Sequence, residues 1–123
     1  MLGHVSLGVR DLALAGAFYD AAMTSLGWVR LWDGGARGLG YGPPGGGEKL
    51  NLFAYADARP PGPGFHLAFD APDCAAVDAF HAAALANGGN DAGPPGLRPH
   101  YSPTYYAAFV IDPDGHKLEA VRQ

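Results

Sequence analysis

Two similar stretches of sequence decide the fold: His4-Val-Ser-Leu-Gly-Val-Arg-Asp11 and His66-Leu-Ala-Phe-Asp-Ala-Pro-Asp73. They lie at an offset of 62 residues, and the same offset relates Phe18 to Phe80. Self-similarity at one fixed offset is the signature of an internal repeat. The chain is therefore interpreted as two copies of one structural unit.

A second match lies near the end of each half. Lys49-Leu-Asn51 corresponds to Lys117-Leu-Glu119, at an offset of 68 residues. The six extra residues are predicted between the helix and the last strand of the second half. With 123 residues the chain has the size of one domain. We expect a single domain whose repeats span about residues 1–58 and 64–123.

Each half has the pattern of a strand, a helix and three further strands. Apolar and polar residues alternate over residues 3–9, which is typical of a half-buried strand, and Asp11 stands where a helix cap is expected. Further strands are predicted at 28–32, 39–41 and 49–55. The second half repeats this order with a strand at 64–70, a helix from Asp73 to about Asn87, and strands at 105–112 and 117–121. Residues 92–103 are expected to form a long, Pro-rich loop. The pattern predicts an α+β fold of two βαβββ units.

Composition excludes several classes of protein. The formal net charge is −4, without the basic stripe of a nucleic-acid-binding protein. No apolar run reaches the length of a membrane span. Cys74 is the only cysteine, which excludes an intramolecular disulfide and a Cys-rich zinc site. We expect a cytoplasmic protein that binds neither nucleic acid nor membranes.

Three residues have the chemistry of metal ligands: His4, His66 and Glu119. The two histidines are equivalent positions of the two repeats, each on the strand face opposite the apolar residues. In the last strand, Leu118 and Ala120 are expected to face the helices, so Glu119 faces the other way. Two imidazoles and one carboxylate suit a divalent Fe, Mn, Co, Ni or Zn ion. Asn51, the repeat equivalent of Glu119, is a poorer ligand, so we expect three protein ligands.

The residues His4-Val-Ser-Leu-Gly-Val-Arg-Asp-Leu12, Phe65-His66-Leu-Ala-Phe69 and Phe109-Val-Ile-Asp-Pro-Asp-Gly-His-Lys-Leu-Glu119 resemble the vicinal oxygen chelate superfamily. This group contains glyoxalases, bleomycin resistance proteins and extradiol dioxygenases. The resemblance implies a cupped, eight-stranded mixed sheet, a homodimer, and a divalent metal held by His4, His66 and Glu119. Asn51 stands where glyoxalase I-like members have a fourth, carboxylate ligand, which weakens a lactoylglutathione lyase reading. The His/His/Glu set matches extradiol dioxygenases and fosfomycin-modifying thiol transferases.

The leading hypothesis is a metal-dependent enzyme whose small substrate chelates the metal through two neighbouring oxygens, by dioxygenase or by lyase/isomerase chemistry. Glu119, Tyr105 and His100 are candidate catalytic residues, the last two as hydrogen-bond donors or general acid–base groups. Ser6 is a further candidate, at a position where the fosfomycin-modifying enzymes have a hydroxyl.

The alternative is a metal-free protein of the same fold that binds or sequesters an aromatic ligand such as a drug. The sequence leaves open whether the cavity is formed by one chain or by two. His116, at the end of a turn, is expected to be exposed.

Overall fold

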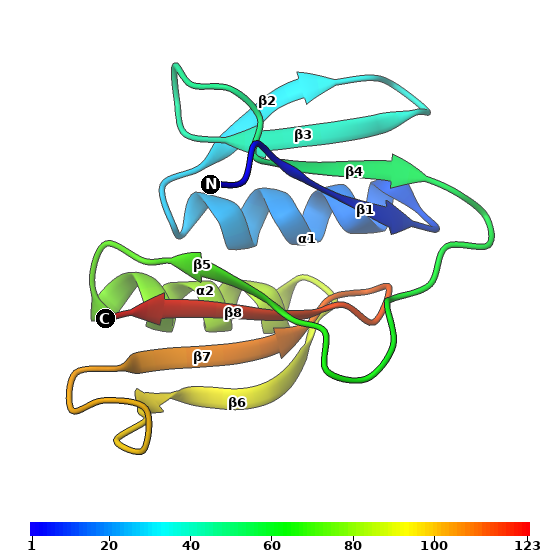
Figure 1. Cartoon of the computed structure of the whole chain (residues 1–123). Helices are drawn as coiled ribbons and strands as arrows, with labels where there is room; N and C mark the ends of the chain where they lie inside the picture. The colour runs from blue at the N-terminus through cyan, green and yellow to red at the C-terminus, as the bar shows by residue number, and fades with distance from the viewer.

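The computed structural model describes all 123 residues and contains two helices and eight strands (Figure 1). The elements of the first repeat are β1 (Val5–Val9), α1 (Leu12–Thr24), β2 (Val29–Asp33), β3 (Gly38–Gly42) and β4 (Leu50–Ala54). Those of the second repeat are β5 (Leu67–Asp70), α2 (Cys74–Ala86), β6 (Asn90–Leu97), β7 (Tyr106–Ile111) and β8 (Lys117–Arg122). Each repeat has the predicted βαβββ order.

Both helices begin where the sequence predicts, because an aspartate caps each of them. The Asp11 carboxylate accepts hydrogen bonds from the backbone N–H groups of Ala13 at 2.9 Å and Leu14 at 3.1 Å. Asp73 accepts one from the backbone N–H of Ala76 at 2.8 Å. These bonds satisfy donors that the first turn of a helix leaves free, and such a cap contributes about 1 kcal/mol.

In each repeat the first strand runs parallel to the last, and the other neighbouring strands are antiparallel. The strand orders are β1-β4-β3-β2 and β5-β8-β7-β6. The α+β class and the duplicated architecture are thus confirmed. The eight strands are hydrogen-bonded as two four-stranded mixed sheets, whose edge strands β1 and β5 share no ladder and border a groove (Figure 1).

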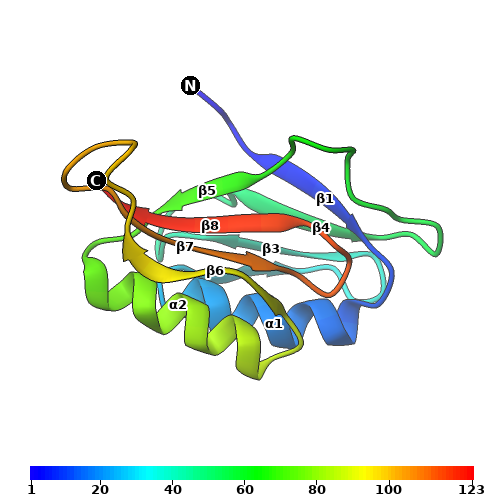
Figure 2. The same cartoon turned by 90° about the horizontal axis from the view of Figure 1, so that it is seen from below.

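One hydrophobic core joins the two repeats. The helices α1 and α2 contact each other and lie on the same side of the sheets (Figure 2). Phe18 and Met23 of α1 and Val77 and Phe80 of α2 are fully buried in the same cluster. Burying such a side chain contributes about 1.5–3 kcal/mol. Since the helices cover one face of each sheet, polar residues on the opposite faces are left to build a site.

The segment from residue 90 to residue 97 differs from the expectation. The predicted loop at 92–103 is wrong for residues 92–97, which belong to β6, and the connection to β7 comprises residues 98–105. β6 is the edge of its sheet, and its pairing with β7 is interrupted between Gly93 and Gly96, around Pro94 and Pro95. Proline lacks the N–H that a ladder needs, so an edge strand with a bulge is where a sheet tolerates it.

His116 is also placed differently from the expectation, because only 1% of it is exposed. Its Nδ1 lies 2.8 Å from a carboxylate oxygen of Asp112, and the Tyr19 hydroxyl donates to the same oxygen at 2.5 Å. The other oxygen accepts the backbone N–H groups of Asp114 and His116. Tyr19 belongs to α1 and Asp112 to the β7–β8 turn, so this buried network connects the two repeats. Because imidazole has a hydrogen-bond partner here, it can lie inside the protein.

The network keeps Asp112 ionised and Tyr19 protonated at neutral pH. Burial alone would raise the pKa of Asp112, but the hydrogen bonds from His116 and Tyr19 outweigh it and hold that pKa below its usual value. Burial and the neighbouring carboxylate raise the pKa of Tyr19 well above 10. The phenol therefore donates and the carboxylate accepts.

Both helices have 13 residues, and neither has the length and hydrophobicity needed to span a bilayer.

We predict that Asp112→Ala lowers the free energy of unfolding by about 3–5 kcal/mol at pH 7, because it leaves buried donors without an acceptor. The folded-state pKa of Asp112 lies below its unfolded value. This contribution is therefore present above about pH 4 and declines as the pH falls through the folded-state pKa. Urea unfolding of the wild type and the variant at pH 7 and at pH 3 measures both effects.

The control is Asp57→Ala, which changes an exposed aspartate in a turn outside the network. We expect it to leave the unfolding midpoint close to that of the wild type. An Asp112→Ala protein within about 1 kcal/mol of the wild type at pH 7 would show that the network does not connect the repeats energetically.

Candidate functional site

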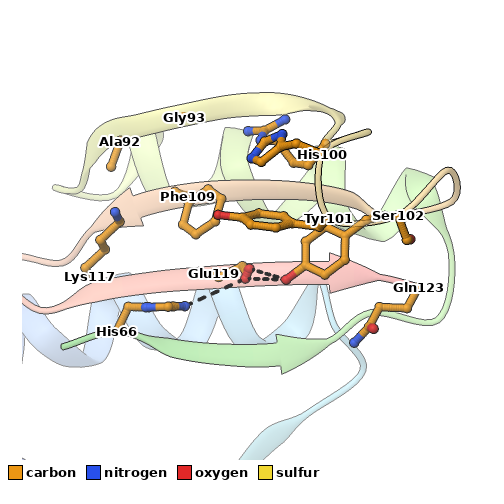
Figure 3. Close-up of a pocket in the computed structure, with 12 residues that line it drawn as sticks. His66, Ala92, Gly93, His100, Tyr101, Ser102, Phe109, Lys117, Glu119 and Gln123 are labelled. Atoms are coloured by element: carbon orange, nitrogen blue, oxygen red, sulfur yellow. Dashed lines mark hydrogen bonds and ion pairs between the residues drawn. The ribbon is translucent and has the colours of Figure 1, made fainter. Parts of the chain in front are cut away.

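The largest cavity of the molecule, about 740 Å³, lies on the face of the second sheet that the helices leave uncovered (Figure 3). It is bounded by the start of β5, by β6, β7 and β8, and by the 98–105 loop. The lining residues are His66, Ala92, Gly93, Arg98, His100, Tyr101, Ser102, Tyr105, Phe109, Lys117, Glu119 and Gln123.

Glu119 lies at the floor of this cavity, and β8 explains why. Leu118 and Ala120 belong to the hydrophobic core, whereas Lys117 and Glu119 line the cavity, as the predicted alternation requires. In the sheet, Glu119 pairs with Ala68 on one side and with Phe109 on the other. Only 1% of Glu119 is exposed. A buried carboxylate at the floor of an open cavity needs donors or a cation to compensate its charge.

Tyr105 supplies one such donor. Its hydroxyl donates to both carboxylate oxygens of Glu119, at 2.8 and 3.0 Å. Burial, together with the hydrogen bond to Glu119 and its charge, raises the pKa of Tyr105 to about 12. The phenol is therefore protonated at neutral pH and acts as a donor. It holds the carboxylate in one orientation.

His66 approaches the same carboxylate from β5. It precedes β5 by one residue, and the parallel pairing of Leu67 with Leu118 brings it beside β8. Its Nε2 lies 4.0 Å from Oε2 of Glu119, and Figure 3 shows the ring pointing toward that oxygen. The ring also packs edge-on against Phe109, with centroids 6.0 Å apart. The structure thus brings together two of the three predicted metal ligands.

His4 does not line the cavity that contains His66 and Glu119. It is exposed just before β1 and lines a smaller, mainly apolar groove of about 270 Å³ between β1 and β5, with Trp28 and Phe69. No three His, Cys, Asp or Glu side chains of one chain are grouped so that they could hold a metal ion. Ser6 is likewise exposed on β1 and does not line the Glu119 cavity. These positions belong to the first sheet, which is separate from the sheet that carries His66 and Glu119.

Asn51 occupies the position in the first sheet that Glu119 occupies in the second. It pairs with Ser6 as Glu119 pairs with Ala68, which confirms the equivalence inferred from the repeats. Its side-chain oxygen Oδ1 is buried and has no hydrogen-bond partner within the chain.

The 98–105 loop forms one wall of the cavity with aromatic side chains. The rings of His100 and Tyr101 lie 4.2 Å apart, and those of Tyr101 and Tyr105 lie 5.0 Å apart. His100 and Tyr105 thus line the cavity together, and their catalytic role stays a prediction. Phe109 and Lys117 also line the cavity. Strand alternation in the sequence places Phe109 on the face of Tyr105 and Lys117 on the face of Glu119, although it assigns neither residue a role.

The side chains present fit a divalent metal ion in part. An imidazole nitrogen and a carboxylate oxygen are ordinary ligands of Fe, Mn, Co, Ni and Zn. The Glu119 carboxylate is buried beside His66, with a neutral phenol as its other partner. The chain brings two such side chains together here, and no third His, Cys, Asp or Glu side chain joins them.

Comparison with known proteins agrees with this architecture. The chain is 34% identical to a glyoxalase/bleomycin resistance protein from Albidiferax ferrireducens T118, whose crystal structure matches with a TM-score of 0.85 over 100% of this chain and 98% of that one. A glyoxalase-related enzyme from Fulvimarina pelagi has 22% identity and a TM-score of 0.74, with coverages of 98% and 86%. A fosfomycin resistance protein from Listeria monocytogenes has 18% identity and a TM-score of 0.70, with coverages of 98% and 91%.

The last two similarities show the fold alone. The comparison with curated proteins finds no match. The family model of the Glyoxalase/Bleomycin resistance protein/Dioxygenase superfamily matches residues 1–120, which is nearly the whole chain. The chain therefore belongs to the glyoxalase/bleomycin resistance protein/dioxygenase superfamily.

Proposed function

We propose that this protein is a divalent-metal-dependent enzyme acting on a small substrate that chelates the metal through two neighbouring oxygens. The observation that carries the proposal is the buried Glu119 carboxylate, 4.0 Å from His66 Nε2 at the floor of the cavity. Both groups are ligands of divalent transition metals. The cavity leaves room beside them for a bound molecule.

His66 and Glu119 would hold the ion, and Tyr105 would keep the carboxylate oriented. When bound, the metal supplies Lewis acidity that stabilises negative charge on the oxygens of the substrate. Iron, manganese, cobalt, nickel and zinc all suit a nitrogen and oxygen ligand set. Hydrogen-bond partners of metal ligands tune such sites, and the Tyr105 hydroxyl would do so through its hydrogen bonds to Glu119.

Proton transfer would fall to the 98–105 loop. Tyr105, whose pKa is raised to about 12, serves as a donor rather than as a base at neutral pH. His100 lines the same wall, and an imidazole can accept or donate a proton during the reaction. These roles are compatible with dioxygenase and with lyase or isomerase chemistry.

The third ligand would be His4 of a second copy of the chain. Superfamily members often form dimers, and His4 is exposed next to an unpaired strand edge, where a partner can reach it. In a symmetric dimer each chain would give His4 to one site and the pair His66 and Glu119 to the other. Ser6, two residues further along β1, would reach the same composite cavity.

The alternative function is metal-free binding of an aromatic ligand. The observation that favours it is the wall of aromatic rings formed by Tyr101, Tyr105 and Phe109, which offers stacking surfaces. Metal titration distinguishes the two functions, because a sequestering protein of this kind needs no ion.

We expect metal-stripped protein to bind one equivalent of Co²⁺, Mn²⁺ or Zn²⁺ per chain, measured by calorimetry and by elemental analysis after desalting. His66→Ala and Glu119→Gln each remove a ligand and should weaken binding more than the roughly 10–100-fold typical of losing a mere hydrogen-bond partner of a ligand. His81→Ala is the matched control, because His81 is an imidazole on α2, paired with Asp91 outside the cavity. Unchanged affinity in both site variants would refute the metal site.

Mixing experiments test whether two chains share the site. His4→Ala and His66→Ala proteins, unfolded together and refolded, should regain about a quarter of the metal sites, because half of the sites in each mixed dimer are intact. A mixture of His66→Ala and Glu119→Gln should regain none, because both ligands come from one chain. Equal recovery in the two mixtures, or none in either, would contradict a composite site.

A further inference from the structure

The cavity contains two cationic side chains, Arg98 and Lys117, that form no ion pair within the chain. The ion pairs of arginine with carboxylates in this protein involve Arg10 and Arg30, and no lysine forms one. The chain as a whole is acidic, with a formal net charge of −4. The cavity therefore contains two unpaired positive charges, although the net charge of the chain is negative.

Arg98 is held in place by the backbone of β6. Its Nη1 donates to the carbonyl of Gly96 and its Nη2 to the carbonyl of Pro94, both at 2.8 Å. A Cβ atom at Gly93 would lie 3.3 Å from Nη2 and 3.2 Å from the Phe109 ring, so this glycine makes room for both. The Pro-Pro-Gly stretch of the edge strand thus positions a guanidinium whose remaining N–H donors are free.

Lys117 approaches the same ring from β8. Its Nζ lies 5.1 Å from the centroid of Phe109, and Cζ of Arg98 lies 5.7 Å from that centroid. Lys117 is exposed, and it shares the strand face of Glu119, two residues away. Both cations therefore gather at Phe109, which pairs with Glu119 in the sheet.

The charges of the cavity do not cancel. Glu119 is the only carboxylate among its lining side chains, and it is already bonded to Tyr105 and near His66. Two positive charges in a concave site raise the local potential and attract anions. A guanidinium binds planar or tetrahedral oxyanions through paired N–H donors, and an ammonium adds a second point charge.

We propose that Arg98 and Lys117 bind an oxyanion group of the substrate, so that the protein acts on small molecules carrying a carboxylate or a phosphonate besides their chelating oxygens. That the bound molecule is a substrate rests on the proposed function. The binding of an oxyanion by Arg98 and Lys117 itself requires no metal. Phe109 is the ring that both cations approach, and it pairs with Glu119 in the sheet. It offers a surface for the part of the molecule that joins the two groups.

The test uses three probes with the same pair of chelating oxygens: 3,4-dihydroxybenzoate, 3,4-dihydroxyphenylphosphonate and the neutral 3,4-dihydroxybenzamide. Calorimetry on metal-stripped protein measures the affinity of each. We expect at least one acid to bind about tenfold or more tightly than the amide, with an advantage that shrinks as salt is added. The acid that binds more tightly identifies the oxyanion.

Arg98→Gln and Lys117→Gln should each remove most of this advantage and leave the affinity for the amide unchanged. Arg37→Gln is the matched control, because Arg37 lies in the turn between β2 and β3, away from the cavity. Circular dichroism and thermal unfolding show whether each variant is folded. Amide and acids binding equally well, or a loss in Arg98→Gln that is the same for all three probes, would overturn the inference.

Metal titration of the same samples separates the two proposals. Metal binding that depends on His66 and Glu119, without a preference for the acids, would refute the oxyanion site alone. A preference for the acids without metal binding would refute the metal-dependent function and leave the oxyanion site standing.

Discussion

The parallel pairing of β5 with β8 is the constraint on which the candidate site depends. It places the beginning of the second repeat beside the end of the chain, so that His66 and Glu119 meet although they are far apart in sequence. Side-chain alternation in β8 then decides that Leu118 faces the core and Glu119 faces the cavity. A shift of this register by one residue would bury the wrong side chains and turn the carboxylate toward the helices.

Glu119 is a buried charge with few hydrogen-bond partners. A carboxylate that is 1% exposed loses nearly all its hydration, and Tyr105 is its only hydrogen-bond donor within the chain. Asp112, a second deeply buried carboxylate, accepts hydrogen bonds from Tyr19, His116 and two backbone N–H groups. This contrast separates the two roles. Asp112 is compensated inside the protein and holds the repeats together, whereas Glu119 leaves lone pairs for an external cation or donor.

Much of the fold followed from local patterns. The repeat offset, the alternation in the first strand and the capping aspartates predicted the order of the elements, since each reflects hydrogen bonding or burial within a few residues. The strand β6 escaped prediction because Pro94 and Pro95 are typical of loops, and only its place at the sheet edge makes them tolerable. The burial of His116 depends on a hydrogen-bond network with α1, nearly a hundred residues away, which no local pattern reveals.

The candidate site, like the fold, was predictable from the sequence only in part. Strand phase identified Glu119 correctly as a residue facing away from the core, and the repeat pointed to His66. The equivalence of the two repeats could not show whether His4 lies near His66 and Glu119 of the same chain. That depends on how the two separate sheets pack against each other. The bonds of Arg98 to the β6 backbone could not be predicted, because they depend on a strand that the sequence did not indicate.

The most direct test of the central claim is an anomalous difference map from crystals grown with Co²⁺ or Mn²⁺. We expect one strong peak per chain within about 2.0–2.3 Å of His66 Nε2 and a Glu119 carboxylate oxygen, with His4 of the partner chain completing the protein ligands. A fully occupied peak elsewhere, or no peak beside Glu119 at saturating metal, would contradict it.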